Sequence, residues 1–249
     1  MRRSMKLMGL SFAIVCGMLA TAAPAAAQTG RVVLSVNGIS QSGTETVSGN
    51  STFTTNAESG SFTSTFPVKS GPGFDASLTI GLKGPFGLSI GGTSFKATGS
   101  ADVSAKVPHP FFFNQPRTVT GTVSMTREET TARLALTLSS APGGRFQFSA
   151  YAGPAYVSVK QDLVDAVTFT DSYPYDTATF KAANTSQPSK TAVGFAGGAD
   201  ASFYFTKSIG IGLSASVVSA TINFSTVDNT TVAVKAGGTQ VGGGLRIRF

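Results

Sequence analysis

Apolar and polar residues alternate with a period of two through most of the chain, and no long amphipathic helical pattern is present. The alternation predicts eight β-strands, at residues 31–36, 74–82, 86–92, 132–139, 145–153, 192–205, 209–217 and 239–249. Each segment has one apolar face and one small or polar face. In "ARLALTLS", for example, leucines alternate with Arg133, Ala135 and Thr137. The sequence therefore predicts an all-β fold.

Alternation alone does not say which face of a strand points inward. A soluble sandwich or a lipocalin-like barrel places the apolar face inside, whereas a membrane barrel turns it toward lipid. The connections between the predicted strands favour the membrane barrel, because short turns at 83–85, 141–144 and 207–208 alternate with long segments. The long segments, expected to be extracellular loops, cover about 41–73, 96–131 and 160–190.

Aromatic residues gather near the short turns and at the end of the chain. We expect an aromatic girdle at this level, as membrane interfaces favour, formed by Phe86, Phe146, Phe203 and Phe205. If the first strand rises from the short-turn side, eight strands return the carboxyl terminus to that side. Phe249 then lies in the girdle; the alternative is a core phenylalanine that ends an ordinary sheet.

The amino terminus has the pattern of a secretory signal peptide. Arg2, Arg3 and Lys6 precede a short apolar stretch, and "AAPAAAQ" offers a cleavage site after Ala27, so we expect residues 1–27 to be removed. Losing these bases lowers the formal net charge from +7 to +4, which is too mild to indicate a nucleic-acid partner. The single cysteine, Cys16, is lost as well, and the chain has one histidine, so we expect no metal or other cofactor.

With this leader, the eight alternating segments, the unequal connections and the terminal "LRIRF", the chain resembles the small outer-membrane β-barrel proteins of Gram-negative bacteria, of the OmpA and OmpX type. The resemblance implies an eight-stranded antiparallel up-and-down transmembrane β-barrel over residues 28–249, surrounded by lipid of the bacterial outer membrane. In that family the barrel-assembly machinery recognises a last strand that ends in phenylalanine. The resemblance thus gives this role to Leu245, Ile247 and Phe249.

An eight-stranded barrel has a lumen just wide enough to be filled by side chains. We expect an interior polar cluster in which opposite charges pair, made of Asp75, Arg133, Asp200, Arg246 and Arg248. This expectation favours a plugged barrel with a structural or surface-binding role. The alternative is a narrow porin-like channel for small polar solutes, lined by those charges.

Two segments between the predicted strands carry the remaining candidate chemistry. His109, in "VPHPFFFNQPR", raises the third possibility of a rim enzyme acting on lipid, but no recognised spacing links it to a nucleophile and an acid. We therefore assign no catalytic residue. A possible patch for an unknown extracellular ligand comprises His109, Phe111, Phe112, Phe113, Tyr173 and Tyr175. The reading we favour is instead a small core, with the loop folded back onto the barrel mouth.

Overall fold

The computed structural model describes residues 32–42, 46–140, 144–225 and 231–249, so the expected leader lies outside the described residues. The described chain is all-β, and every strand pairing in it is antiparallel. Its strands are β1 (Val32–Gln41), β2 (Thr46–Thr55), β3 (Glu58–Pro67), β4 (Gly71–Gly81), β5 (Phe86–Val107), β6 (Arg117–Ser139), β7 (Phe146–Gln161), β8 (Leu163–Ser172), β9 (Thr177–Ser186), β10 (Ser189–Tyr204), β11 (Ile209–Ser225) and β12 (Thr231–Arg248). Among these residues, no helix is long and apolar enough to cross a membrane.

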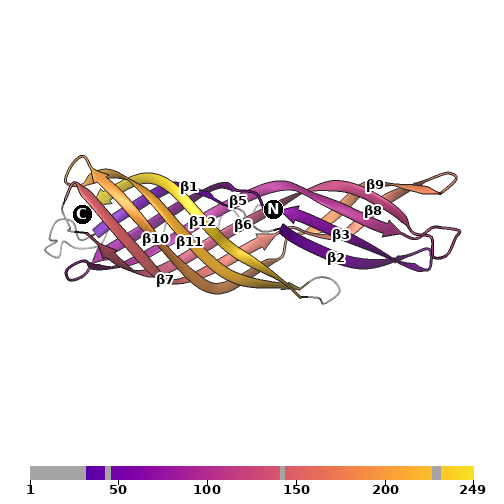
Figure 1. Cartoon of the computed structure of the whole chain (residues 1–249), viewed down its shortest axis with the longest axis horizontal. Coiled ribbons are helices and arrows are strands. Elements are labelled where there is room, and N and C mark those ends of the chain that lie inside the picture. The colour runs from indigo at the N-terminus through magenta and orange to yellow at the C-terminus, as the bar shows by residue number, and fades with distance from the viewer. Residues whose placement is uncertain (1–31, 43–45, 141–143, 226–230) are drawn as a thin grey trace, which may run out of the picture.

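Eight of the strands form a ring, in the order β5-β4-β1-β12-β11-β10-β7-β6, and pairing between β5 and β6 closes it. Each member of the ring pairs with two neighbours, so the backbone hydrogen bonds run around the whole circumference. Each of the eight predicted segments overlaps one of these strands, to within one residue at its ends. The expected all-β, antiparallel, up-and-down architecture is confirmed. Figure 1 shows the ring strands winding around one axis in the left half of the molecule.

The three segments expected to be long loops contain regular β-structure. β5 and β6 have 22 and 23 residues and stay paired from Phe86 and Leu138 to Val107 and Arg117, far beyond the ring. β3 pairs with this outer part of β5 and carries β2, while the β8–β9 hairpin packs against β6. We call this outer part of the molecule, on the right of Figure 1, the extension.

The apolar face changes sides along a single strand, so the alternation that marks the ring does not mark the extension. On β6, Leu136 points outward with 68% of its surface exposed, and its neighbour Thr137 points inward with 4% exposed. Further along the same strand Thr120 points outward, and the apolar Val119 is buried. The inward residues of the extension form an apolar core that includes Phe62, Phe66, Val103, Val107, Val119 and Met125.

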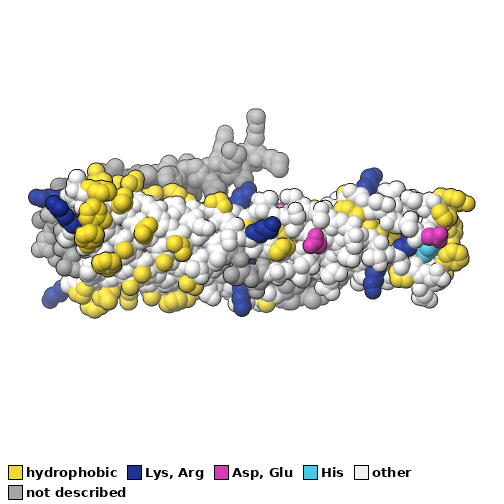
Figure 2. Space-filling model, turned by 45° about the horizontal axis from the view of Figure 1, so that its top comes forward, with side chains coloured by type: hydrophobic (Ala, Val, Ile, Leu, Met, Phe, Trp, Pro, Cys, Tyr) yellow, Lys and Arg dark blue, Asp and Glu magenta, His cyan; other side chains and the backbone are white. Residues whose placement is uncertain are grey.

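The ring carries an exposed belt of large apolar side chains, which Figure 2 shows as yellow atoms over the left part of the molecule. Its exposed members include Phe74, Ile80, Leu82, Phe86, Leu88, Ile90, Leu134, Leu136, Leu138, Phe146, Phe148, Phe195, Ile209, Ile211, Leu213, Val241, Leu245 and Phe249. On β4 and its end the belt runs over residues 74–82. With the usual strand rise and barrel tilt, it is about 20 Å high. That height is close to the apolar band of an outer-membrane barrel.

Candidate functional site

The lumen of the ring holds a network of charged and amide side chains. Asp75 on β4 accepts a hydrogen bond from Arg133 Nη1 on β6 at 2.5 Å, and its second oxygen accepts one from Asn37 Nδ2 on β1 at 3.0 Å. The Arg133 guanidinium also lies over the Tyr151 ring, 5.1 Å from its centroid. Asp75, Arg133 and Asn37 are all buried. The charge of the Asp75 carboxylate is therefore balanced by Arg133 inside the barrel, and Asn37 supplies a further hydrogen bond.

The network continues across the lumen through Arg246 on β12. Its Nη1 donates to Asn37 Oδ1 at 2.6 Å, and its Nη2 forms an ion pair with Asp200 on β10. Ser202 donates a further hydrogen bond to Asp200. Six side chains from five strands thus form one connected chain of hydrogen bonds from wall to wall.

Arg248 lies one layer closer to the short turns. Its guanidinium rests on the Tyr204 ring, 3.5 Å from the centroid, and Nη2 donates to Gln147 Oε1 at 2.8 Å. The structure therefore places all five members of the expected interior polar cluster inside the ring. It joins Asp75 to Arg133 and Asp200 to Arg246, while Arg248 pairs with no carboxylate among the described residues.

Little free space remains beside this network. A cavity of about 50 Å³ lies among Ser35, Asp75, Arg133, Tyr151 and Asp200, room for one or two water molecules.

A second polar network, which sequence reasoning missed, lies where the ring meets the extension. Arg127 and Glu129, alternate residues of β6, form a buried ion pair at 2.6 Å, and Gln41 Nε2 donates to Glu129 at 2.9 Å. Gln240 Nε2 on β12 donates to Gln41 Oε1 at 2.8 Å. The signal was the pattern Arg127, Glu129, Thr131, Arg133 at period two, which continues the inward polar face of β6 into a segment interpreted as a loop.

The girdle residues lie on the outer surface at the short-turn end. Phe86, Phe146 and Phe205 are exposed, and Phe203 contacts Phe146 and Phe205 with ring centroids 4.8 and 5.3 Å apart. Phe249 is also exposed, and its backbone N–H donates to the Val32 carbonyl at 2.9 Å. The last strand is therefore held at its end by the first.

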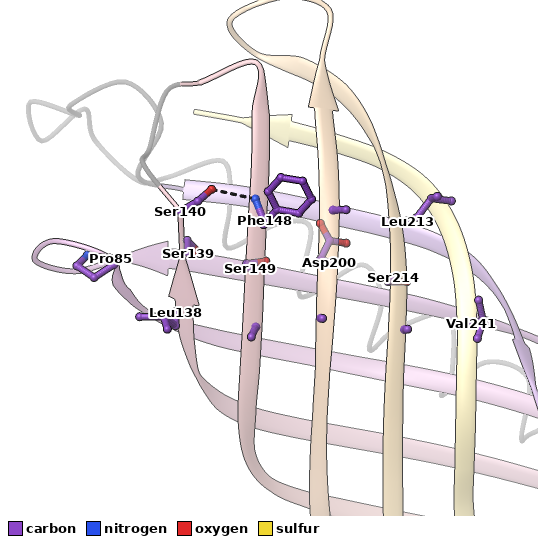
Figure 3. Close-up of a pocket in the computed structure, with 14 residues that line it drawn as sticks. Pro85, Leu138, Ser139, Ser140, Phe148, Ser149, Asp200, Leu213, Ser214 and Val241 are labelled. Carbon is purple, nitrogen blue, oxygen red and sulfur yellow. Dashed lines mark hydrogen bonds between the residues drawn. The ribbon is translucent and has the colours of Figure 1, made fainter.

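The outer wall also has an apolar groove of about 760 Å³. Figure 3 shows it between Leu138 and Phe148 on one side and Leu213 and Val241 on the other. Ala150, Ala199 and Ala215 occupy one row of paired positions across β7, β10 and β11, and their small side chains create the depression. The groove lies within the apolar belt.

The two aromatic loop segments meet at the far tip of the extension. The rings of Phe111 and Tyr175 are 5.2 Å apart edge to face, and Tyr173 contacts Tyr175 at 6.0 Å. Buried Arg117 holds both segments, because Nη2 donates to the Pro108 carbonyl at 3.0 Å and Nη1 forms an ion pair with Asp171 at 2.7 Å.

The tip is not the small core at the barrel mouth that we favoured. Phe111, Phe112, Phe113 and Tyr173 are 67%, 55%, 70% and 88% exposed, and they lie at the end of the extension farthest from the ring. The loop cannot fold back onto the mouth because β5 and β6 stay paired up to Val107 and Arg117. Figure 2 shows apolar side chains gathered at this right-hand end.

His109 is buried beneath the tip. Its Nδ1 accepts hydrogen bonds from the backbone N–H groups of Phe111 and Phe112 at 3.1 and 3.2 Å. The imidazole of His109 therefore fixes the conformation of this loop. No cluster of three or more histidine, cysteine or carboxylate residues suited to a metal ion occurs among the described residues.

No protein-family model and no curated protein match the chain. Among solved structures, the outer membrane protein OprG from Pseudomonas aeruginosa is 11% identical with a TM-score of 0.48, covering 88% of this chain and 96% of that one. Neisserial surface protein A is 9% identical with a TM-score of 0.44 (90% and 100% covered). Ail, the attachment invasion locus protein of Yersinia pestis, is 11% identical with a TM-score of 0.41 (88% and 99%). Similarities this distant carry nothing on function, and the fold assignment rests on the strand pairings above.

Proposed function

We propose that the chain is an integral outer-membrane β-barrel with a plugged lumen, whose extension stands outside the bilayer and serves a structural or surface-binding role. The belt of exposed apolar side chains around the ring supports insertion into lipid, because so large an apolar surface is unfavourable in water. The inward apolar core of the extension supports its position in water. The groove in Figure 3 would then be filled by hydrocarbon chains.

The observation that carries the plugged interior is the hydrogen-bonded chain from Arg133 through Asp75, Asn37 and Arg246 to Asp200. An ion path would have to break these buried ion pairs and leave a buried charge without its partner, a situation that costs about 3–5 kcal/mol when one partner is removed. This cost favours a plug over the porin-like alternative.

The surface-binding part of the proposal rests on the aromatic tip. Exposed phenylalanines in a row commonly mark a partner site, and here Arg117 and His109 hold the loops that present them. The rim-enzyme alternative is the weakest of the three, since His109 Nδ1 is engaged by two backbone N–H groups far from the ring.

Planar-bilayer recordings on the purified, refolded protein test the plug. We expect no stable conductance steps from the wild-type chain. Arg246→Ala with Asp200→Ala, which opens the network on one side, should admit small ions if the protein still folds. Regular steps from the wild type would favour the narrow channel instead.

A further inference from the structure

Positive charge gathers at the short-turn end of the ring. Lys83 and Lys207 lie in two of the short turns, Arg145 lies between β6 and β7, directly before β7, and Arg248 lies next to the carboxyl terminus. None of these turns contains aspartate or glutamate. The bases lie just beyond the aromatic girdle, the level at which lipid headgroups meet the water when the belt is inserted.

Three of these bases line one cavity of about 610 Å³ at the mouth of the ring. Arg145 comes from the turn between β6 and β7, Lys207 from the turn between β10 and β11, and Arg248 from the end of β12. Gly144, Tyr204, Phe205 and Thr206 also line it, and no acidic side chain is among the described lining residues.

Arg248 is the fixed element of this cavity. Its residue is 5% exposed, and Tyr204, Gln147 and the Gly144 carbonyl hold the guanidinium in place. Its Nε nonetheless has no hydrogen-bond partner among the described residues. Asp200, in the neighbouring layer of the lumen, is already engaged by Arg246 and Ser202. The cavity is therefore lined by one preorganised cation, Arg248, and by two exposed bases, Arg145 and Lys207.

We propose that this cavity binds a phosphate group. The phosphate comes either from the headgroup of an anionic phospholipid or from free inorganic phosphate. Guanidinium and ammonium groups are the side chains that best match phosphate oxygens. The exposed ring of Phe205 borders the cavity on the belt side and gives a lipid apolar surface next to its headgroup. Phe148, three residues along the chain from Arg145, lines the apolar outer-wall groove.

The proposal goes beyond the proposed function and depends on membrane insertion only for the lipid source. The test compares the wild type with Arg145→Gln/Lys207→Gln, which leaves the buried Arg248 in place. The matched control is Lys83→Gln/Lys190→Gln, which removes the same charge at two positions that do not line the cavity.

Each refolded protein is released from mixed phosphatidylglycerol and phosphatidylcholine micelles, and the lipids it retains are counted by native mass spectrometry. We expect the wild type and the control to retain phosphatidylglycerol preferentially. The cavity variant should retain about tenfold less, the scale of losing charge-assisted hydrogen bonds. Equal retention by all three proteins would overturn the proposal. Equal loss in the control would also overturn it, because general surface charge would then explain the binding.

A second arm titrates inorganic phosphate against the detergent-solubilised proteins and follows the phosphorus NMR linewidth. Broadening with the wild type but not the cavity variant, together with displacement of the retained lipid, supports a site that reads the phosphate group from either source. Lipid retention without phosphate broadening assigns the site to the headgroup alone. Broadening without lipid retention assigns the site to free phosphate. The absence of both signals would overturn the proposal. Because heat-modifiable gel migration reports the folded barrel separately, loss of the fold cannot be mistaken for loss of the site.

Discussion

Replacing Leu136 with arginine tests whether the apolar belt faces lipid or water. Leu136 is 68% exposed on the outside of β6, and the residues paired with it, Leu88 and Ala152, also face outward. An arginine at this position meets apolar neighbours and whatever surrounds the ring. It cannot reach the lumen without crossing the sheet.

The expected cost follows from that environment. In lipid, an outward arginine near the middle of a membrane barrel costs about 2–4 kcal/mol. That range lowers the folding equilibrium constant by between about thirtyfold and about a thousandfold. In water, the same substitution at an exposed position changes stability by no more than about 0.5 kcal/mol. The two environments therefore differ well beyond the error of a urea titration.

The assay is urea-dependent folding into phosphatidylcholine vesicles, read from far-UV circular dichroism and gel migration. Thr120→Arg is the matched control because Thr120 lies on the same strand and face but in the extension, where it is exposed beside Ser104. We expect it to be nearly neutral. Val119→Arg should be severe, because Val119 is 2% exposed inside the apolar core and the new charge has no partner there.

The pattern across the three variants is the decisive result. Outward arginine should be harmful in the ring and harmless in the extension. If Leu136→Arg and Thr120→Arg have the same small effect, the ring is not surrounded by hydrocarbon and the account of the belt fails.

Three further outcomes follow from the described contacts. Asp75→Asn removes the counterion of buried Arg133 and should lower the free energy of unfolding by about 3–5 kcal/mol in the same titration; an unchanged midpoint would mean the ion pair is unimportant. Gly121→Val places a side chain where the Phe180 ring lies, so protease should cut the extension sooner while gel migration of the ring stays heat-modifiable. A digestion pattern like that of the wild type would contradict this packing. Phe249→Ala should slow insertion by the barrel-assembly machinery in cells, measured by pulse-chase, and insertion at the normal rate would remove the proposed signal.

Period-two alternation was enough to locate the strands of the ring. Every predicted segment lies within a ring strand or overlaps it, because a barrel strand repeats one environment on each face for many residues. The sequence predicted that opposite charges in the interior cluster pair, but not that Asp75 pairs with Arg133. Opposite charges at inward positions of a narrow barrel have few other partners.

The extension was missed for a physical reason. At the level of Thr130 and Thr131 on β6, the surroundings change from the apolar belt to the polar surface of the extension, so the polar residues move to the outer face. Even-numbered residues of β6 face outward on both sides of this level, but they are apolar in the ring and mostly polar in the extension. A reading that followed only the apolar residues ended the strand at Ala132 and took the continuation for a loop.

The position of the aromatic tip could not be predicted for the same reason. Whether Phe111 folds back or points away depends on the paired length of β5 and β6, which is fixed by hydrogen bonds between residues such as Ala105 and Val119. Those pairings leave a weak signal in a segment rich in serine and threonine. The contact between the aromatic side chains of Phe111 and Tyr175 joins two loops that are distant in sequence.

The most direct test of the account is the accessibility of a nitroxide moved along the outer face of β6. With Cys16 in the expected leader, single cysteines at Leu134, Leu136, Thr120 and Thr122 can be spin-labelled in the refolded chain without competing thiols. In lipid vesicles, relaxation by oxygen should dominate at Leu134 and Leu136, and relaxation by a water-soluble nickel chelate should dominate at Thr120 and Thr122. Equal access of the nickel chelate to all four sites would show that no bilayer surrounds the ring.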